Sequence, residues 1–145
     1  MLLIVVLFTI GSLSAQQLSG KEKRIVQTIE ENNDEAIAFL ERVVNINSGT
    51  LNKDGVKEVG EVFSEAFKDI GFGSRWIAMP EEMNRAGHMF AEINGNRGKK
   101  LLLIGHLDTV FEEDSPFQTF KMVNDSIAHA PGGNDMKGGN VIILY

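Results

Sequence analysis

The sequence predicts an α/β fold in which helices cover a mixed sheet. Up to about residue 70 the apolar residues recur at helical spacing, and afterwards they form short runs with strand character. The chain has 145 residues, of which 43% are hydrophobic and 23% charged, and this is the composition of a folded globular domain. Helices first and strands afterwards favour a sheet with helices packed on it.

Three helices are expected in the first half of the chain. Ser19 can cap the first of them, and Glu22 completes a capping box three residues later. The polar stretch Asn32-Asn33-Asp34 predicts a break before the second helix, and Gly71-Phe72-Gly73 predicts the end of the third. The expected positions are therefore residues 19–31, 34–44 and 54–70.

Three strands are expected to follow, at residues 75–79, 88–93 and 101–104. The second and third are separated by Asn94-Gly95-Asn96-Arg97-Gly98, which is typical of a hairpin turn. Leu101 to Ile104 is apolar at every position, which predicts a strand buried on both faces in the middle of the sheet. Because the apolar run Val141 to Tyr145 reaches the last residue, we expect a truncated domain whose final apolar face has no partner.

Residues 1–15 are expected to be a signal peptide. No charged residue occurs from Met1 to Gln17, and Ser12-Leu13-Ser14-Ala15 suits a cleavage zone. The apolar run is shorter than the roughly 20 residues of a membrane-spanning helix. The start lacks the usual Lys or Arg, and a buried N-terminal strand is the alternative. A signal peptide predicts export to the periplasm or the extracellular space, with no membrane attachment after its removal.

Charge and cysteine content limit the kinds of function. The formal net charge is −6, and an acidic chain has little general affinity for nucleic acid because it cannot replace the counterions on phosphates. The sequence has no cysteine, so it has neither disulfides nor thiolate ligands. A bound zinc ion would have to use histidine and carboxylate side chains.

A histidine and a carboxylate follow directly after the expected buried strand. His106 and Asp108 are two residues apart, so both lie on the same side of an extended backbone. The carboxyl ends of strands are where α/β sheets bind ligands. A metal-binding imidazole needs its second nitrogen held, and Asp108 can hold it. Taken alone, this pattern more often marks a hydrogen-bonded histidine with no ligand.

A second cluster lies in the glycine-rich stretch Pro131 to Gly139, which contains the carboxylate of Asp135. Glycine permits positive φ angles and a close approach of the backbone to a ligand. The stretch has no Gly-Lys-[Ser/Thr] step, so it is not a phosphate-binding loop. A lone Asp in a turn is usually part of the turn, so this cluster indicates a binding site only in combination with His106 and Asp108.

Together the two motifs resemble those of the M20 metallopeptidases. The resemblance lies in Gly105-His106-Leu107-Asp108-Thr109-Val110 and in Asp135-Met136-Lys137-Gly138-Gly139, and it extends over most of residues 34–145. The stretch from Gly105 to Phe117 is most similar to the glutamate carboxypeptidase branch. One departure is Ala130-Pro131-Gly132, where the family commonly has Gly-Pro-Gly or Gly-x-Gly.

The resemblance implies a role for each of three residues. His106 would bind one zinc ion, Asp135 would bridge two, and Asp108 would be the catalytic-site carboxylate that orients the His106 imidazole. The cofactor would be two Zn²⁺ per complete site, with Co²⁺ or Mn²⁺ as alternatives. Residues 16–145 would be the N-terminal part of the catalytic domain, and the family's catalytic Glu and remaining ligands would lie further on.

The implied activity is zinc-dependent hydrolysis of an amide or peptide bond with release of an amino acid, by a carboxypeptidase or an N-acyl amino acid amidohydrolase. The substrate would be a small N-acyl amino acid or a peptide, and a homodimer of the full-length protein is compatible with this implication. Without the missing ligands, the chain itself is expected to be inactive. Two alternatives stay open, a non-catalytic binding member of the same fold and an unstable gene fragment.

The remaining candidate ligands are interpreted without a metal. His88 and His129 match no ligand position of the family, so we interpret them as structural or surface residues. Glu112, Glu113 and Asp114 are interpreted as a solvated acidic loop rather than as a third metal ligand.

Overall fold

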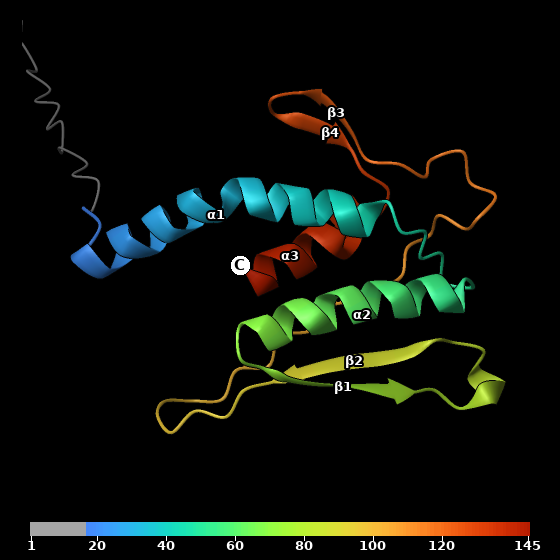
Figure 1. Cartoon of the computed structure of the whole chain (residues 1–145), viewed down its shortest axis with the longest axis horizontal. Coiled ribbons are helices and arrows are strands. Elements are labelled where there is room, and N and C mark those ends of the chain that lie inside the picture. The colour runs from blue at the N-terminus through green and yellow to red at the C-terminus, as the bar shows by residue number, and fades with distance from the viewer. Residues whose placement is uncertain (1–16) are drawn as a thin grey trace, which may run out of the picture. The chain divides into compact units, whose positions relative to one another are not determined.

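The structure, a computed structural model, describes residues 17–145 as three α-helices and two small antiparallel sheets (Figure 1). The predicted α/β class is confirmed, but the predicted mixed sheet is wrong for the described residues, because both sheets are two-stranded and antiparallel. The predicted signal peptide, residues 1–15, lies outside the described residues. Asn32–Tyr145 forms one compact unit, which contains every site residue discussed below. Across residues 17–145, each helix is too short or too polar to cross a membrane.

Helix α1 spans Gly20–Val44 and starts at the expected capping box. Ser19 N donates to the Glu22 carboxylate at 2.7 Å, and Glu22 N donates to Ser19 Oγ at 3.3 Å. The hydrogen bonds from Ser19 lower the pKa of Glu22. The predicted break at Asn32–Asp34 is wrong, because the helix runs through it. Asn and Asp cost less than about 1 kcal/mol each inside a helix, and this stretch has no glycine or proline to end it.

Helix α2 spans Lys53–Asp69, close to its expected position. The side chain of Asn52 caps it by accepting a hydrogen bond from Gly55 N at 3.0 Å. Gly71 follows the helix with a φ of 91°, so the expected glycine C-cap region is confirmed. One face of α2 supplies much of the core, whose buried members are Val43, Val59, Val62, Phe63, Phe67 and Val141.

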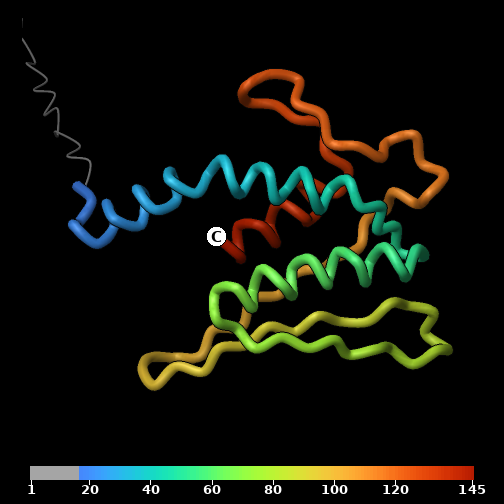
Figure 2. Tube along the Cα trace, viewed as in Figure 1, coloured from blue at the N-terminus to red at the C-terminus, as the bar shows by residue number. Residues whose placement is uncertain are grey.

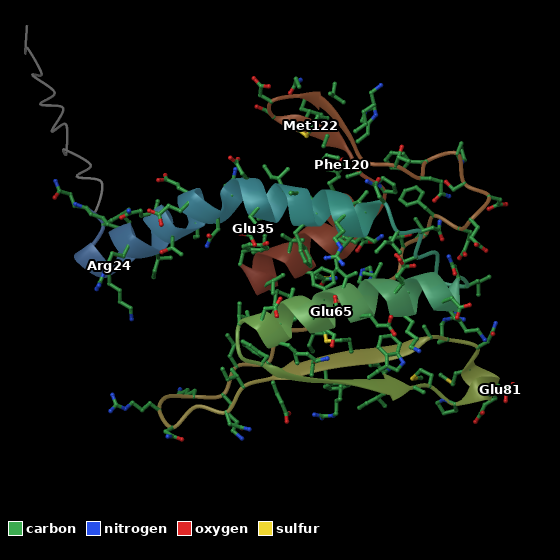
Figure 3. All side chains as sticks on the ribbon, viewed as in Figure 1. Arg24, Glu35, Glu65, Glu81, Phe120 and Met122 are labelled. Atoms are coloured by element: carbon green, nitrogen blue, oxygen red, sulfur yellow. The ribbon has the colours of Figure 1, made fainter. Side chains whose placement is uncertain are left out.

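Strands β1 (Gly73–Ala78) and β2 (Gly87–Glu92) form an antiparallel pair, within two residues of the expected positions. The short 3-10 helix η1 (Glu81–Met83) lies in the turn between them, where Glu81 is labelled in Figure 3. The sheet packs against α2 closely enough that a Cβ on Gly60 would meet the Trp76 ring at 2.5 Å. Helix α2 therefore lies between this sheet and helix α3 (Figure 1).

The predicted central strand, Leu101 to Ile104, does not form. The segment pairs with no strand among the described residues, and its side chains are 54% to 81% exposed. In Figure 2 it passes behind α2 after the 94–98 loop. The hairpin predicted at 94–98 is therefore wrong, and the hairpin turn lies between β1 and β2 instead. An apolar run becomes a strand only where a neighbour satisfies its backbone groups.

The end of the chain is a helix that packs on the core. Helix α3 spans Gly138–Leu144 and follows the π-turn η2 (Gly133–Lys137). Val141 is 5% exposed and packs in the core, and the Tyr145 ring lies 6.2 Å from the Phe39 ring. The expectation that the apolar face of Val141 to Tyr145 lacks a partner is therefore wrong for Val141 and Tyr145, while Ile142 stays 80% exposed. A second hairpin, β3 (Lys121–Asn124) with β4 (Ile127–His129), was not expected from the sequence.

Candidate metal centre

The three expected site residues meet around the His106 imidazole. His106 Nε2 lies 2.8 Å from Asp135 Oδ1. His106 Nδ1 lies 3.0 Å from the backbone oxygen of Asp108 and 3.2 Å from its carboxylate Oδ1. The side chains of His106, Asp108 and Asp135 are 43%, 35% and 80% exposed. The ring therefore has one carboxylate on each nitrogen, in a position that solvent and a metal ion can reach.

The loop between α1 and α2 holds the backbone next to His106 and Asp108. Ser48 Oγ donates to Leu107 O at 2.9 Å, and Thr109 N donates to Ser48 O at 2.8 Å. Thr50 N donates to Thr109 O at 3.1 Å, and Gly49 and Thr109 form a parallel β-bridge. This short ladder fixes the backbone around Asp108, although no strand precedes it at residues 101–104.

Helix α3 holds the same segment from the other side. Asn140, in the first turn of α3, donates from Nδ2 to the backbone oxygen of His106 at 2.6 Å. Gly105 makes room for this bond, because a Cβ at that position would collide with Asn140 Oδ1. The backbone of His106 is thus fixed by an amide that lies five residues after Asp135.

The Asp135 loop is anchored by a buried lysine. Lys137 is 1% exposed, and its Nζ donates to Val43 O and to Ile46 O, both at 2.8 Å. Burial lowers the pKa of Lys137 to about 8. Carbonyl groups at a helix C-terminus have no partner within the helix, so the amine satisfies Val43 O at the end of α1. This anchor joins the loop that carries Asp135 to the core.

Two opposing effects act on the pKa of His106. Burial alone would lower it, but the hydrogen bond to Asp135, followed by the hydrogen bond and charge of Asp108, raises it above the ordinary value of 6.5. Only the imidazolium donates from both ring nitrogens. Its proton therefore stabilises the metal-free fold below pH 6.5, and this stabilisation is lost as the pH rises through the raised pKa.

Asp135→Asn is expected to lower the pKa of His106, because it removes the largest of the interactions that raise it. The measurement is an NMR titration of the imidazole in the metal-free chain. Asp125→Asn, in the turn between β3 and β4, is the matched control and should leave the titration unchanged. An unchanged pKa in Asp135→Asn would show that the two side chains do not meet in solution.

The donor atoms are of a type that zinc binds, but their number is smaller than a complete zinc site needs. Zinc binds imidazole nitrogen and carboxylate oxygen at about 2.0–2.2 Å, and a tetrahedral ion would hold Nε2 and Oδ1 about 3.3 Å apart. The observed 2.8 Å between His106 and Asp135 would need to open by only about 0.5 Å. Among residues 17–145, no three or more such side chains are placed to hold one ion together, so the candidate centre consists of the pair His106 Nε2 and Asp135 Oδ1.

Glu112, His129 and His88, which could also serve as ligands by residue type, lie next to other parts of the protein instead. The Glu112 carboxylate accepts from Leu51 N at 3.2 Å, and so helps to hold the loop after α1. The His129 ring packs edge-on against Phe117, with ring centres 6.4 Å apart. His88 lies within β2, opposite Ile77.

An apolar cleft of about 550 Å³ opens beside His106 and Asp108. Its walls include Phe63 and Phe67 of α2, Met89 of β2 and the exposed segment Leu101 to Ile104. The candidate site therefore lies next to a surface that can take up an apolar group.

Comparison with known proteins relates the chain to the peptidases. No family model matches it. It is similar to a carboxypeptidase, with 30% identity over 141 residues that make up 95% of this chain. That relative is carboxypeptidase G2 from Pseudomonas sp. (strain RS-16), and the chain spans 32% of its length.

Four residues that support the site were not predicted individually. They are Ser48, Thr50, Lys137 and Asn140. Each of the four forms its hydrogen bond with a residue 34 to 94 positions away, so no local spacing indicates them. The only available signal was the family resemblance, because Lys137 lies in one of its two motifs and the other three residues lie within residues 34–145, over most of which it extends.

Proposed function

We propose that this chain is part of a zinc-dependent hydrolase of the M20 metallopeptidase type, which cleaves an amide or peptide bond and releases an amino acid. The observation that carries the proposal is the 2.8 Å approach of His106 Nε2 to Asp135 Oδ1, from segments 29 residues apart, with Asp108 on the other ring nitrogen. Similarity to carboxypeptidase G2 supports a peptidase over an unrelated metal-binding protein.

Each of the three side chains has a part in this proposal. His106 would bind the metal through Nε2 and Asp135 through its carboxylate. The Nδ1–H group donates to the Asp108 backbone oxygen at 3.0 Å, and the charge of the Asp108 carboxylate, 3.2 Å away, also holds the proton on Nδ1, so that the Nε2 lone pair faces the metal. When bound, zinc supplies an acidified water and polarises the carbonyl of the scissile bond. Because a proton and the metal compete for Nε2, acid weakens metal binding. Export of the protein and a small N-acyl amino acid or peptide substrate belong to the same proposal.

Asp108→Asn is expected to weaken zinc binding by about 10–100-fold, because the amide no longer attracts the Nδ1 proton with a full charge. The measurement is competition for zinc between the chain and a chromophoric chelator. Asp114→Asn, which removes an exposed carboxylate from the acidic loop, is the control and should bind zinc like the parent. Equal affinities for all three chains, or no zinc binding by the parent, would contradict the proposal.

A second candidate is a non-catalytic member that binds an amino acid derivative on the same fold. It is supported by the apolar cleft of about 550 Å³ beside His106 and Asp108, which can take up such a ligand without hydrolysing it. Assay of N-acyl amino acids and C-terminal glutamate peptides with a protein that contains this chain distinguishes the two. Turnover supports the hydrolase, and ligand binding without turnover supports the second candidate.

A further inference from the structure

We propose that Thr50 is a positioning residue of the metal centre, whose hydroxyl fixes the Asp108 carboxylate and through it the His106 imidazole. This inference rests on the proposed function. Thr50 Oγ1 lies 2.6 Å from Asp108 Oδ2, although the two residues are 58 positions apart. The three side chains therefore form a continuous series, from the hydroxyl to the carboxylate to the ring.

The two oxygens of Asp108 have different partners. Oδ1 lies 3.2 Å from His106 Nδ1, whose hydrogen bond goes to the Asp108 backbone oxygen at 3.0 Å, whereas Oδ2 accepts the hydrogen bond from Thr50. The terminal torsion of an aspartate is broad, so a carboxylate held at one oxygen only can rotate. A donor on Oδ2 restricts this rotation and keeps Oδ1 directed at the ring. Hydrogen bonds to an ionised acceptor are among the stronger ones in proteins.

Thr50 is itself held in place. Its backbone N donates to Thr109 O at 3.1 Å, and its hydroxyl also lies 3.3 Å from the same oxygen. The neighbouring Gly49 forms the parallel bridge to Thr109. Threonine is branched at Cβ, which limits the rotation of its side chain. The hydroxyl is therefore directed at Asp108 by a backbone that is already fixed.

The Thr50 hydroxyl contacts the side chain of Asp108, whereas the hydroxyls of Ser48 and Thr109 contact backbone groups. Ser48 Oγ donates to a backbone oxygen, that of Leu107, so its loss would affect the loop as a whole. Thr109 is buried in the same bridge, but its hydroxyl accepts from Phe111 N at 3.3 Å instead of reaching Asp108. Thr109→Val is thus a matched control, because it changes a threonine of the same ladder and leaves Asp108 untouched.

The experiment compares Thr50→Val, Thr50→Ser and Thr109→Val in the full chain, each also measured by urea unfolding. Long-range ¹H–¹⁵N NMR of the metal-free chain, at a pH where the imidazole is neutral, gives the fraction of His106 with its proton on Nδ1. That fraction is expected to fall in Thr50→Val, to return in Thr50→Ser, and to stay at the parent value in Thr109→Val. Chelator competition should show zinc affinity lowered about tenfold in Thr50→Val only.

Each outcome decides the inference. A parent-like tautomer in Thr50→Val, a shift that serine does not reverse, or an equal shift in Thr109→Val overturns it. Should valine at position 50 unfold the chain, Thr50→Ala must give the same tautomer shift, and its absence overturns the inference as well. If the parent chain binds no zinc while the tautomer shift occurs, the proposed function fails, and what stands is that Thr50 positions the Asp108 carboxylate and the His106 ring.

Discussion

His106→Ala is expected to abolish zinc binding by this chain, and to abolish hydrolysis in any active protein that contains it. The imidazole is one of the two donors that the proposed function assigns to the metal, and Asp108 contacts its second ring nitrogen. Asp135 alone is an exposed carboxylate, with 80% of its side chain in solvent, and a single carboxylate binds zinc weakly. Chelator competition measures the first effect, and release of the amino acid product measures the second.

His129→Ala is the matched control for this prediction. His129 is a histidine of the same chain, and its ring packs against Phe117 rather than facing a carboxylate. Zinc binding should be unchanged in His129→Ala, and both variants should unfold at urea concentrations near that of the parent. Retention of parent-like zinc affinity by a folded His106→Ala chain would show that the metal binds elsewhere.

Lys137→Met is expected to lower the free energy of unfolding by about 2–5 kcal/mol. The substitution keeps the length of the side chain but removes the donor to Val43 O and Ile46 O. A buried carbonyl left without a partner costs about 1–3 kcal/mol. Lys57→Met is the control, because Lys57 makes only an exposed ion pair with Glu61 at 3.7 Å, and it should change stability by less than about 1 kcal/mol. Urea unfolding measures both variants.

A chemical rescue separates the hydrogen bonds of Lys137 from its apolar packing. The sequence has no cysteine, so in Lys137→Cys the new thiol is the only one and can be alkylated in the unfolded chain. Bromoethylamine restores an amine at the lysine length, whereas iodoacetamide adds a neutral group. We expect the aminoethylated chain to recover most of the parent stability and the neutral adduct to recover little. Equal recovery by both would show that the contacts to Val43 O and Ile46 O contribute little.

The contribution of Lys137 should also depend on pH. Its pKa is about 8 in the folded chain and 10.5 ordinarily, so between these values the unfolded chain binds the additional proton. Stability rises with pH wherever the unfolded state binds more protons. The stability difference between the parent and Lys137→Met should therefore grow as the pH rises from 8 to 10.5, and shrink as it falls back through 8. A constant difference would show that the amine is not desolvated.

Local patterns predicted the helices and the first two strands well, because their causes lie within a few residues. The capping box of Ser19 and Glu22 and the glycine at position 71 set ends of helices through adjacent backbone groups. The local patterns gave a wrong prediction at residues 32–34, where three polar residues predicted a break and the helix continues. Asn and Asp each cost less than about 1 kcal/mol inside a helix, and a cost of this size is overridden when the rest of the helix is favourable.

The expected strand at Leu101 to Ile104 shows where a local pattern becomes ambiguous. Four consecutive apolar residues fit a strand buried on both faces, but pairing is a property of the neighbour as well as of the segment. The same ambiguity affects Val141 to Tyr145, where an apolar run after two glycines became a helix that places Val141 in the core. Periodicity alone does not distinguish short buried strands from short buried helices.

For the site, the sequence by itself determined the residue types and their order along the chain: His106 with Asp108 two residues later, and Asp135 in a glycine-rich loop. Only the tertiary structure decided that Asp135 reaches the His106 ring and that Thr50 reaches Asp108, across 29 and 58 positions. Local spacing describes which side chains share a face of one segment. Contacts between segments depend on how the whole chain packs, so side-chain hydrogen bonds at such separations leave no periodic signal in the sequence.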